Sequence, residues 1–422
     1  MYFLRQRFEL QGQVAHRLGK GEQFALLEDV YFFVHEGSQK TRWRADCAPT
    51  SARAFVLALA SAALRAHNWS LHHPHQEATM PSTPTFKLSM LDLVAVREGA
   101  SVGQALDVAR QTVQHVERLG FSRYWVAEHH NMTGIASSAT AVLVGHLAGA
   151  TSRIRVGSGG IMLPNHAPLV VAEAFGTLAE LYPGRIDLGL GRAPGTDPLT
   201  MRALRRDRVE TEDDFPRDVA ELQRLLAPAQ PGQRLVAMPG AGTQVPIWLL
   251  GSSLYSAQLA AQRGLPYAFA SHFAPRLLHQ ALDIYRRLFQ PSEHLAAPYV
   301  AIGVPLLAAP SDEEAQYLAS SVYQRVLGIL RGERRRLQPP EANFIAQCLP
   351  QERAAIADFL GAAVVGGPDT VRAGLHALAE STEADELMLV CDVYDPALRL
   401  RALDIAAQAL QAMPESLEPA LA

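Results

Sequence analysis

The sequence predicts an α/β fold, a (β/α)8 TIM barrel with insertions, preceded by an irregular N-terminal extension. From about residue 85 onwards, short apolar strands alternate with helices. The expected strands are nearly continuous in apolar residues, which is typical of parallel strands buried on both faces. About eight such units fit into the roughly 330 residues that follow. We therefore expect an extension over residues 1–84 and a barrel over residues 85–415.

Composition excludes several other classes. With 422 residues, 48% of them hydrophobic, the chain can bury a large core, and its net charge of -4 indicates no nucleic-acid partner. No apolar run reaches the roughly 18 residues that span a bilayer, so no membrane association is expected. Three widely separated cysteines favour a reducing compartment, and thus the cytoplasm, over disulfides.

The extension does not resemble the rest of the chain. It shows no sustained apolar period, and it ends in a polar linker before Met80. We expect either a disordered segment or an artefact of start-site assignment, with translation beginning at Met80. Mass spectrometry of the native protein decides between these, because peptides from before Met80 would contradict the later start. His72, His73 and His75 fit a solvated linker better than a metal site, and no metal site is predicted.

The first expected strand covers residues 86–93 and precedes a helix with an apolar stripe at helical spacing. That stripe consists of Val102, Ala105, Leu106, Ala109, Val113 and Val116. The other seven expected strands cover Phe121–Ala127, Arg153–Gly160, Arg185–Arg192, Val245–Leu250, Tyr267–Ala270, Tyr299–Val304 and Glu386–Val390. The longest insertion, Arg331–Pro350, precedes the last strand. Its arginines Arg334 to Arg336 suit either a mobile lid or a solvated charged face.

Ionisable residues follow the second expected strand directly, as Glu128, His129 and His130. The carboxyl ends of barrel strands are where this fold carries its chemistry. Because adjacent residues of a strand point to opposite sides, we expect only one of the two histidines to face a ligand. A histidine exchanges protons near neutral pH, although a structural histidine bonded to a loop carbonyl is the alternative.

Two further histidines, His166 and His272, also follow strands. They are candidates for the substrate pocket together with Glu128, whose carboxylate is expected to orient a neighbour. For each histidine, packing within a loop is an equally good interpretation.

A phosphate site is indicated where the strand ending at Leu250 is followed by Gly251, Ser252 and Ser253, with Ser256 one turn later. The beginning of a helix offers free N–H groups and the positive end of its dipole. Arg192, at the end of the preceding strand, could add a bidentate cation. Ordinary capping of the helix by one serine is the alternative.

Four segments taken in order resemble the bacterial luciferase-like flavin-dependent monooxygenases. They are Gly120–His130, Val156–Pro164, Gly184–Arg192 and Pro246–Ser253, and the resemblance extends over about residues 85–412. It implies a barrel that binds reduced FMN, forms a flavin C4a-hydroperoxide with O2 and oxidises a small organic substrate. It further implies a separate NAD(P)H-dependent flavin reductase and a homodimer.

The resemblance also assigns roles to residues. His129 would face the flavin, Arg192, Ser252, Ser253 and Ser256 would hold its phosphate, and Gly159-Gly160 would form a cis peptide beneath the ring. Gly191 stands where the luciferases have a reactive cysteine, which argues against light emission but not against a monooxygenase. Two alternatives remain: hydride transfer with a reduced deazaflavin, and flavin binding without catalysis.

Overall fold

The computed structural model describes residues 7–9, 31–36, 39–44, 86–192, 198–204 and 214–410. The chain forms two compact units, Met1–Ser82 and Thr83–Ala422. In the first unit, β1 (Arg7–Glu9), β2 (Tyr31–Glu36) and β3 (Gln39–Arg44) form an antiparallel sheet in that order. The linker histidines and Met80 lie outside the described residues, so translation from Met80 stays a prediction.

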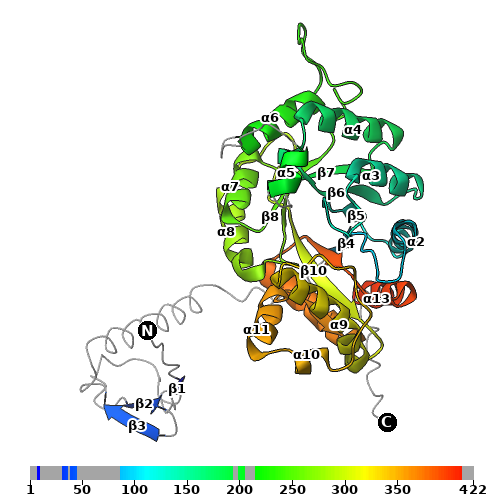
Figure 1. Cartoon of the computed structure of the whole chain (residues 1–422). Helices are drawn as coiled ribbons and strands as arrows, with labels where there is room; N and C mark the ends of the chain where they lie inside the picture. The colour runs from blue at the N-terminus through cyan, green and yellow to red at the C-terminus, as the bar shows by residue number, and fades with distance from the viewer. Residues whose placement is uncertain are drawn as a thin grey trace, which may run out of the picture. The chain divides into compact units, whose positions relative to one another are not determined.

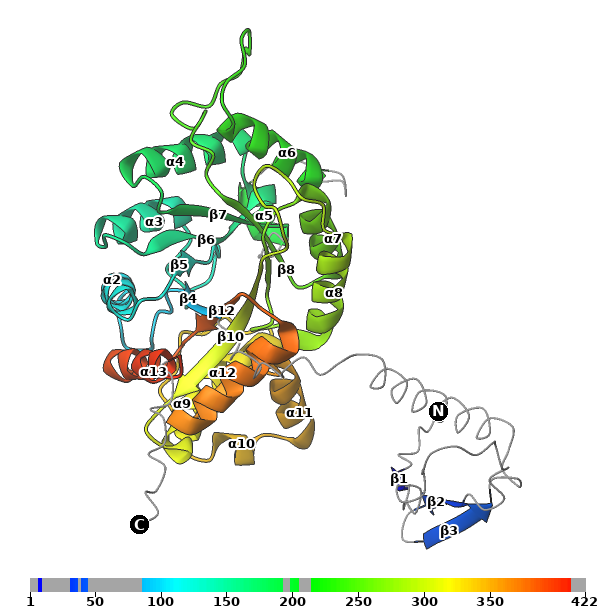
Figure 2. The same cartoon turned by 180° about the vertical axis from the view of Figure 1, so that it is seen from behind.

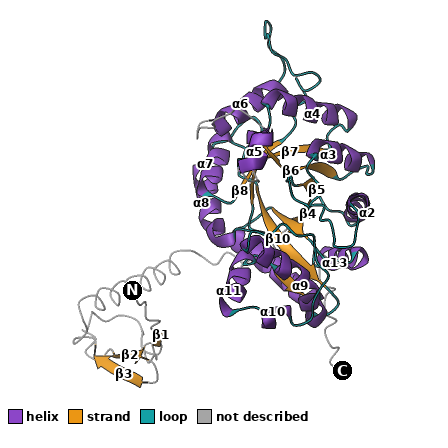
Figure 3. Cartoon of the chain, in the orientation of Figure 1, coloured by secondary structure: helices purple, strands orange, loops and turns teal. Residues whose placement is uncertain are grey.

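The second unit contains a closed barrel of eight parallel strands, as the sequence predicts (Figures 1 and 3). Each strand pairs with the next one along the chain, and the last pairs with the first. The strands are β4 (Lys87–Asp92), β5 (Arg123–Val126), β6 (Arg155–Met162), β7 (Ile186–Gly191), β8 (Ile247–Gly251), β9 (Tyr267–Phe269), β10 (Val300–Ala308) and β12 (Glu386–Val390).

Helices cover the outside of this barrel (Figure 2). The helices of this unit are α2 (Val102–Arg118), α3 (Thr140–Gly149), α4 (Pro168–Leu181), α5 (Pro198–Leu204), α6 (Asp214–Leu226), α7 (Leu254–Arg263), α8 (Leu278–Leu288), α9 (Asp312–Leu330), α10 (Phe344–Gln347), α11 (Pro350–Phe359), α12 (Pro368–Thr382) and α13 (Pro396–Gln408), with short 3-10 turns at Leu163–Asn165 and Pro275–Leu277. Helix α2 begins at a capping box in which Ser101 and Gln104 satisfy each other's backbone N–H groups. No helix among the described residues is both long and apolar enough to cross a membrane.

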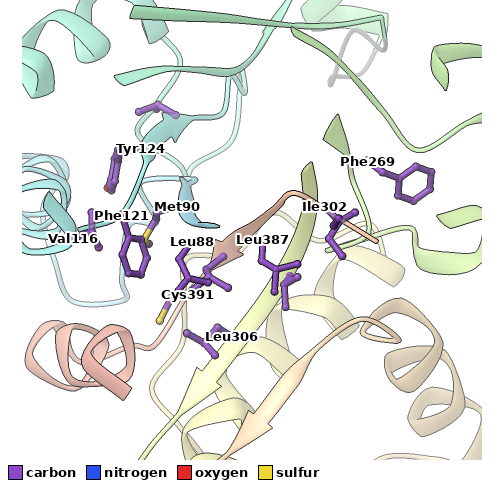
Figure 4. Packing of buried hydrophobic residues seen from close by; sticks show 14 of the residues in the cluster. Leu88, Met90, Val116, Phe121, Tyr124, Phe269, Ile302, Leu306, Leu387 and Cys391 are labelled. Carbon is purple, nitrogen blue, oxygen red and sulfur yellow. The ribbon is translucent and has the colours of Figure 1, made fainter. Parts of the chain in front are cut away.

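The strands separate two apolar layers. Outward-facing side chains such as Leu88, Met90 and Leu387 pack between the sheet and the helices (Figure 4). A smaller cluster fills the barrel interior, where Trp125 and Trp248 meet edge to face with ring centroids 5.0 Å apart. Because successive residues of a strand alternate between these layers, most barrel positions are apolar.

An ionic network closes the interior near the amino ends of the strands. Arg123, the first residue of β5, donates to Asp187 of β7 at 2.8 Å and to Glu386 of β12 at 2.7 Å. Arg155 of β6 pairs with the same aspartate, and its Nη2 lies 2.6 Å from Asp187 Oδ1. Burial lowers the pKa of the Arg123 guanidinium, but its two carboxylate neighbours outweigh burial and raise that pKa above the usual value.

The region between β10 and β12 differs from the sequence expectation. Strand β10 continues to Ala308, beyond its pairing with β12, and there pairs with an additional strand, β11 (Val364–Gly366). The predicted insertion is present, and its arginine segment contacts two loops at the carboxyl ends of β4 and β5. Thr133 Oγ1 donates to the Arg334 carbonyl at 2.8 Å, and Arg336 Nη1 donates to the Ala100 carbonyl at 3.0 Å.

Candidate active site

Glu128 organises the loop that follows β5. It is 1% exposed, and its carboxylate accepts hydrogen bonds from Nε2 of His130 at 2.8 Å and of His166 at 2.9 Å. The backbone N–H of Met162 donates to its other oxygen at 3.1 Å. These donors outweigh burial and hold the pKa of the Glu128 carboxyl below its usual value. Glu128 and His166 were expected in the substrate pocket. In this structure the Glu128 carboxylate holds the side chains of His130 and His166 in place through hydrogen bonds.

The atoms through which Glu128, His130 and His166 could bind a metal lie within 4.8 Å of one another. The sequence predicts no metal here. In the structure Nε2 of each imidazole is hydrogen-bonded to the carboxylate, and the absence of a metal stays a prediction.

His129 takes no part in the hydrogen bonds that join these three residues. Its Nδ1 is buried and has no hydrogen-bond partner among the described residues. Burial lowers the pKa of His129 to about 4, with the nearby positive charge of Arg325 adding to the effect. The imidazole is therefore neutral at pH 7.

His272, which follows β9, also lies at this end of the barrel. Its ring rests on Gly303 of β10, where a Cβ would clash with His272 Nδ1. The preceding Ser271 donates to the Gly303 carbonyl at 2.7 Å and thereby fixes the turn. Burial lowers the pKa of His272 to about 4, and Arg325 and His129 lower it further. His129 and His272 therefore lie close enough that a positive charge on His129 would lower the pKa of His272.

The proposed phosphate residues follow two neighbouring strands, β7 and β8. Gly191 of β7 pairs with Leu250 of β8, which brings Arg192 beside the beginning of α7. The Arg192 guanidinium carbon lies 4.4 Å from the ring centre of Tyr255, in the first turn of α7. Ser253 is the N-cap residue, yet its side chain makes no capping hydrogen bond. Simple capping therefore does not explain this serine.

Ser252 is half-buried beside Ser253, whereas Ser256 is buried. The Ser256 hydroxyl donates to the Ser253 carbonyl at 2.8 Å and lies 3.1 Å from the Tyr267 hydroxyl. In this structure Ser256 therefore supports the turn that presents Ser252 and Ser253.

The Gly159-Gly160 peptide is cis, as the resemblance implies. A Cβ at Gly159 would collide with Leu91, and a Cβ at Gly160 would collide with Leu250, both inside the barrel. These glycines therefore have a packing role in addition to any contact with a cofactor.

Sequence reasoning missed two charged residues at this end of the barrel. Asp392 is the second residue after β12, and Arg325 lies on α9, with Arg325 Nη2 and Asp392 Oδ2 2.6 Å apart. Asp392 could have been found as an acidic residue at a strand end. Arg325 carried no such signal, because it lies in the middle of a long helix.

Comparisons with known proteins are consistent with this architecture. A family model described as luciferase-like monooxygenase matches residues 86–385. A luciferase-like monooxygenase of Escherichia coli K12 is 49% identical over 322 residues, 76% of this chain and 96% of that protein. An N-acetyl-S-alkylcysteine monooxygenase of Bacillus subtilis is 39% identical over 188 residues, 44% of this chain and 56% of that protein. The crystal structure of apo-MsnO8 is 36% identical, with a TM-score of 0.73, and the match covers 78% of this chain and all of that one.

Proposed function

The chain belongs to the luciferase-like monooxygenase family, and we propose that it uses reduced FMN and O2 to oxidise a small organic substrate. The observation that carries the choice of cofactor is the convergence of Arg192 with the beginning of α7. A cation and the N-terminus of a helix beside each other suit a phosphate monoester, which FMN has at one end.

The residues present fit such a group. The first N–H groups of α7 have no partner within the helix, and the Ser253 hydroxyl is not used for capping. Arg192 is exposed and stacked on Tyr255, so its guanidinium is oriented without being buried. In our proposal Arg192, Ser252 and Ser253 hold the phosphate, and Ser256 keeps their turn in place.

Bound reduced FMN would supply the electrons that activate O2. The role of the chain is to orient the reactants, exclude water and move protons. His129 is the proposed proton-transferring residue, because its imidazole is neutral and one nitrogen lacks a partner among the described residues. Glu128 fixes the same loop through His130 and His166.

We further propose that a separate NAD(P)H-dependent reductase supplies the reduced flavin and that the protein works in the cytoplasm as a homodimer. Exposed apolar side chains on the adjacent helices α3 and α4 support the dimer. Val142, Val170 and Leu181 are all more than half exposed.

The cofactor assignment is tested by anaerobic titration of Arg192→Met with FMNH2 and with reduced riboflavin, which lacks the phosphate. We expect FMNH2 to bind about tenfold or more weakly than to the unsubstituted protein, because a charge-assisted hydrogen bond to phosphate is lost. Riboflavin affinity should not change. Arg224→Met on α6 is the control, because that arginine is largely exposed and its nearest carboxylate, Glu221, is 3.9 Å away. Equal loss for both flavins, or no loss, would contradict a phosphate contact.

A further inference from the structure

We propose that Arg325, held in place by Asp392, binds a carboxylate of the substrate, so that this enzyme oxidises small organic acids. The inference rests on the proposed function and names the substrate class for the same site. It depends on where α9 lies and on which polar atoms around Arg325 lack partners.

The path of the chain brings α9 to the carboxyl end of the barrel. Because β10 continues past its pairing with β12 to pair with β11, the chain leaves the barrel before α9 begins. Arg325, thirteen residues after the first residue of α9, then reaches Asp392 at the end of β12. The insertion that follows α9 contacts the loops after β4 and β5. Arg325 is thus on the side of the barrel where His129 and His272 lie.

The Arg325–Asp392 pair is incompletely satisfied. Asp392 is 4% exposed, and its Oδ2 accepts no hydrogen bond of good geometry although Arg325 Nη2 is 2.6 Å away. Among the described residues, Asp392 is the only carboxylate that pairs with Arg325. The Ser321 hydroxyl, one turn earlier on α9, is buried and also lacks a partner there. A hydroxyl can donate to a ligand oxygen, whereas Asp392 Oδ2 can only accept. Buried polar groups are normally satisfied, so the Ser321 hydroxyl, beside the Arg325 guanidinium, fits a ligand that accepts hydrogen bonds.

The chemistry of the guanidinium favours a carboxylate. Its planar fork offers five N–H donors, and one contact with Asp392 leaves the other edge for a second, bidentate anion. The side chain is 22% exposed, which leaves part of it accessible. His129 and His272 are uncharged at neutral pH, so they would not compete for an anionic substrate. Asp392 acts as the positioning residue that keeps the guanidinium at this end of the barrel.

The test compares an acid with its ester. N-acetyl-S-methylcysteine and its methyl ester share the same thioether and differ in the carboxylate, and a relative named for N-acetyl-S-alkylcysteines guides the choice. Calorimetry on the full chain loaded with FMN should show the acid binding about tenfold or more tightly than the ester. Arg325→Met should remove that difference without changing ester affinity. Arg325→Lys, which keeps the charge but loses the fork, should retain part of it.

The matched control is Arg331→Met, two turns further along at the end of α9, where the side chain is half exposed and pairs with Glu352. It should leave the preference for the acid intact. Equal affinities for acid and ester, no binding of the acid, or an unchanged preference in Arg325→Met would overturn the carboxylate site. FMN binding is measured on the same samples. Failure to bind flavin would therefore count against the proposed function, and flavin binding without acid preference only against this inference.

Discussion

His129 and Glu128 are neighbours in the chain with opposite environments. The Glu128 carboxylate has four donors, whereas His129 Nδ1 has no partner among the described residues. The alternation of side chains at the end of β5 separates them, which is why a single strand can supply both an organising residue and a reactive one.

Replacing His129 by alanine should leave FMNH2 affinity unchanged but lower product formation about a hundredfold, because proton transfer by a positioned side chain is lost. Oxygen consumption should continue and release hydrogen peroxide. The measurement is the ratio of peroxide released to O2 consumed with an oxidisable substrate present. His146→Ala, an exposed histidine on α3, is the control. An unchanged ratio in His129→Ala would remove His129 from the catalytic residues.

The two histidines whose Nδ1 atoms are buried should also make stability depend on pH. Burial lowers the pKa of His129 and of His272 to about 4, below the roughly 6.5 of an unfolded chain. Between these values the unfolded state binds more protons, so the unfolding free energy should fall as pH decreases from about 6.5 towards 4. Urea denaturation at pH 7 and pH 5 should show a smaller decrease for His272→Asn than for the unsubstituted protein. The exposed His279 provides the control substitution, and an equal decrease in all three proteins would refute the assignment.

At the scale of single residues, the sequence predicts candidate site residues where they come shortly after a strand. Glu128, His129, His166, Arg192, Ser252, Ser253 and His272 all lie at the carboxyl ends of the barrel strands. It does not predict Arg325, whose place depends on the path of a helix over a strand extension that no local pattern encodes.

At the scale of elements, all eight barrel strands are found within a few residues of their expected bounds. Strands buried on both faces carry uninterrupted apolar runs, which local sequence shows clearly. Strand β11 was missed because three residues, Val364–Gly366, make too short a run to be distinguished from a loop.

The amino-acid composition of the inserted region did not predict how that region contacts the rest of the chain. Arg334 to Arg336 suited either a lid or a solvated charged face, and charge alone could not separate the two. In the structure, Leu337 exchanges backbone hydrogen bonds with Val96 and Glu98, at 3.0 and 2.8 Å. The segment is therefore joined to the β4 loop through its backbone, and pairing of that kind depends on tertiary position rather than on side-chain type.

At the scale of the whole molecule, the barrel depends on what fills its interior. The charges of Arg123, Asp187 and Glu386 join three strands that are far apart in sequence. Arg123→Met should lower the unfolding free energy by about 3–5 kcal/mol, because both carboxylates would remain buried without this partner. Guanidinium denaturation at pH 7 measures the loss. Arg110→Met on α2, where the Asp107 pair is exposed, should change stability by less than about 1 kcal/mol. Similar effects of the two substitutions would contradict a stabilising role for the network.

The family match begins at residue 86, so the extension lies outside it. The activity proposed for this chain therefore depends on the barrel unit, and the most direct measurement of it is made on the full chain. Under anaerobic conditions the protein is titrated with FMNH2 and, separately, with a reduced deazaflavin, and a pulse of O2 is then followed by rapid-scan absorbance. We predict tight binding of FMNH2, weaker binding of the deazaflavin, and a rate of O2 reaction for bound FMNH2 that differs from that of free FMNH2. Preferential binding of the deazaflavin without reaction with O2, or failure to bind FMNH2, would contradict the assignment as an FMN-dependent monooxygenase.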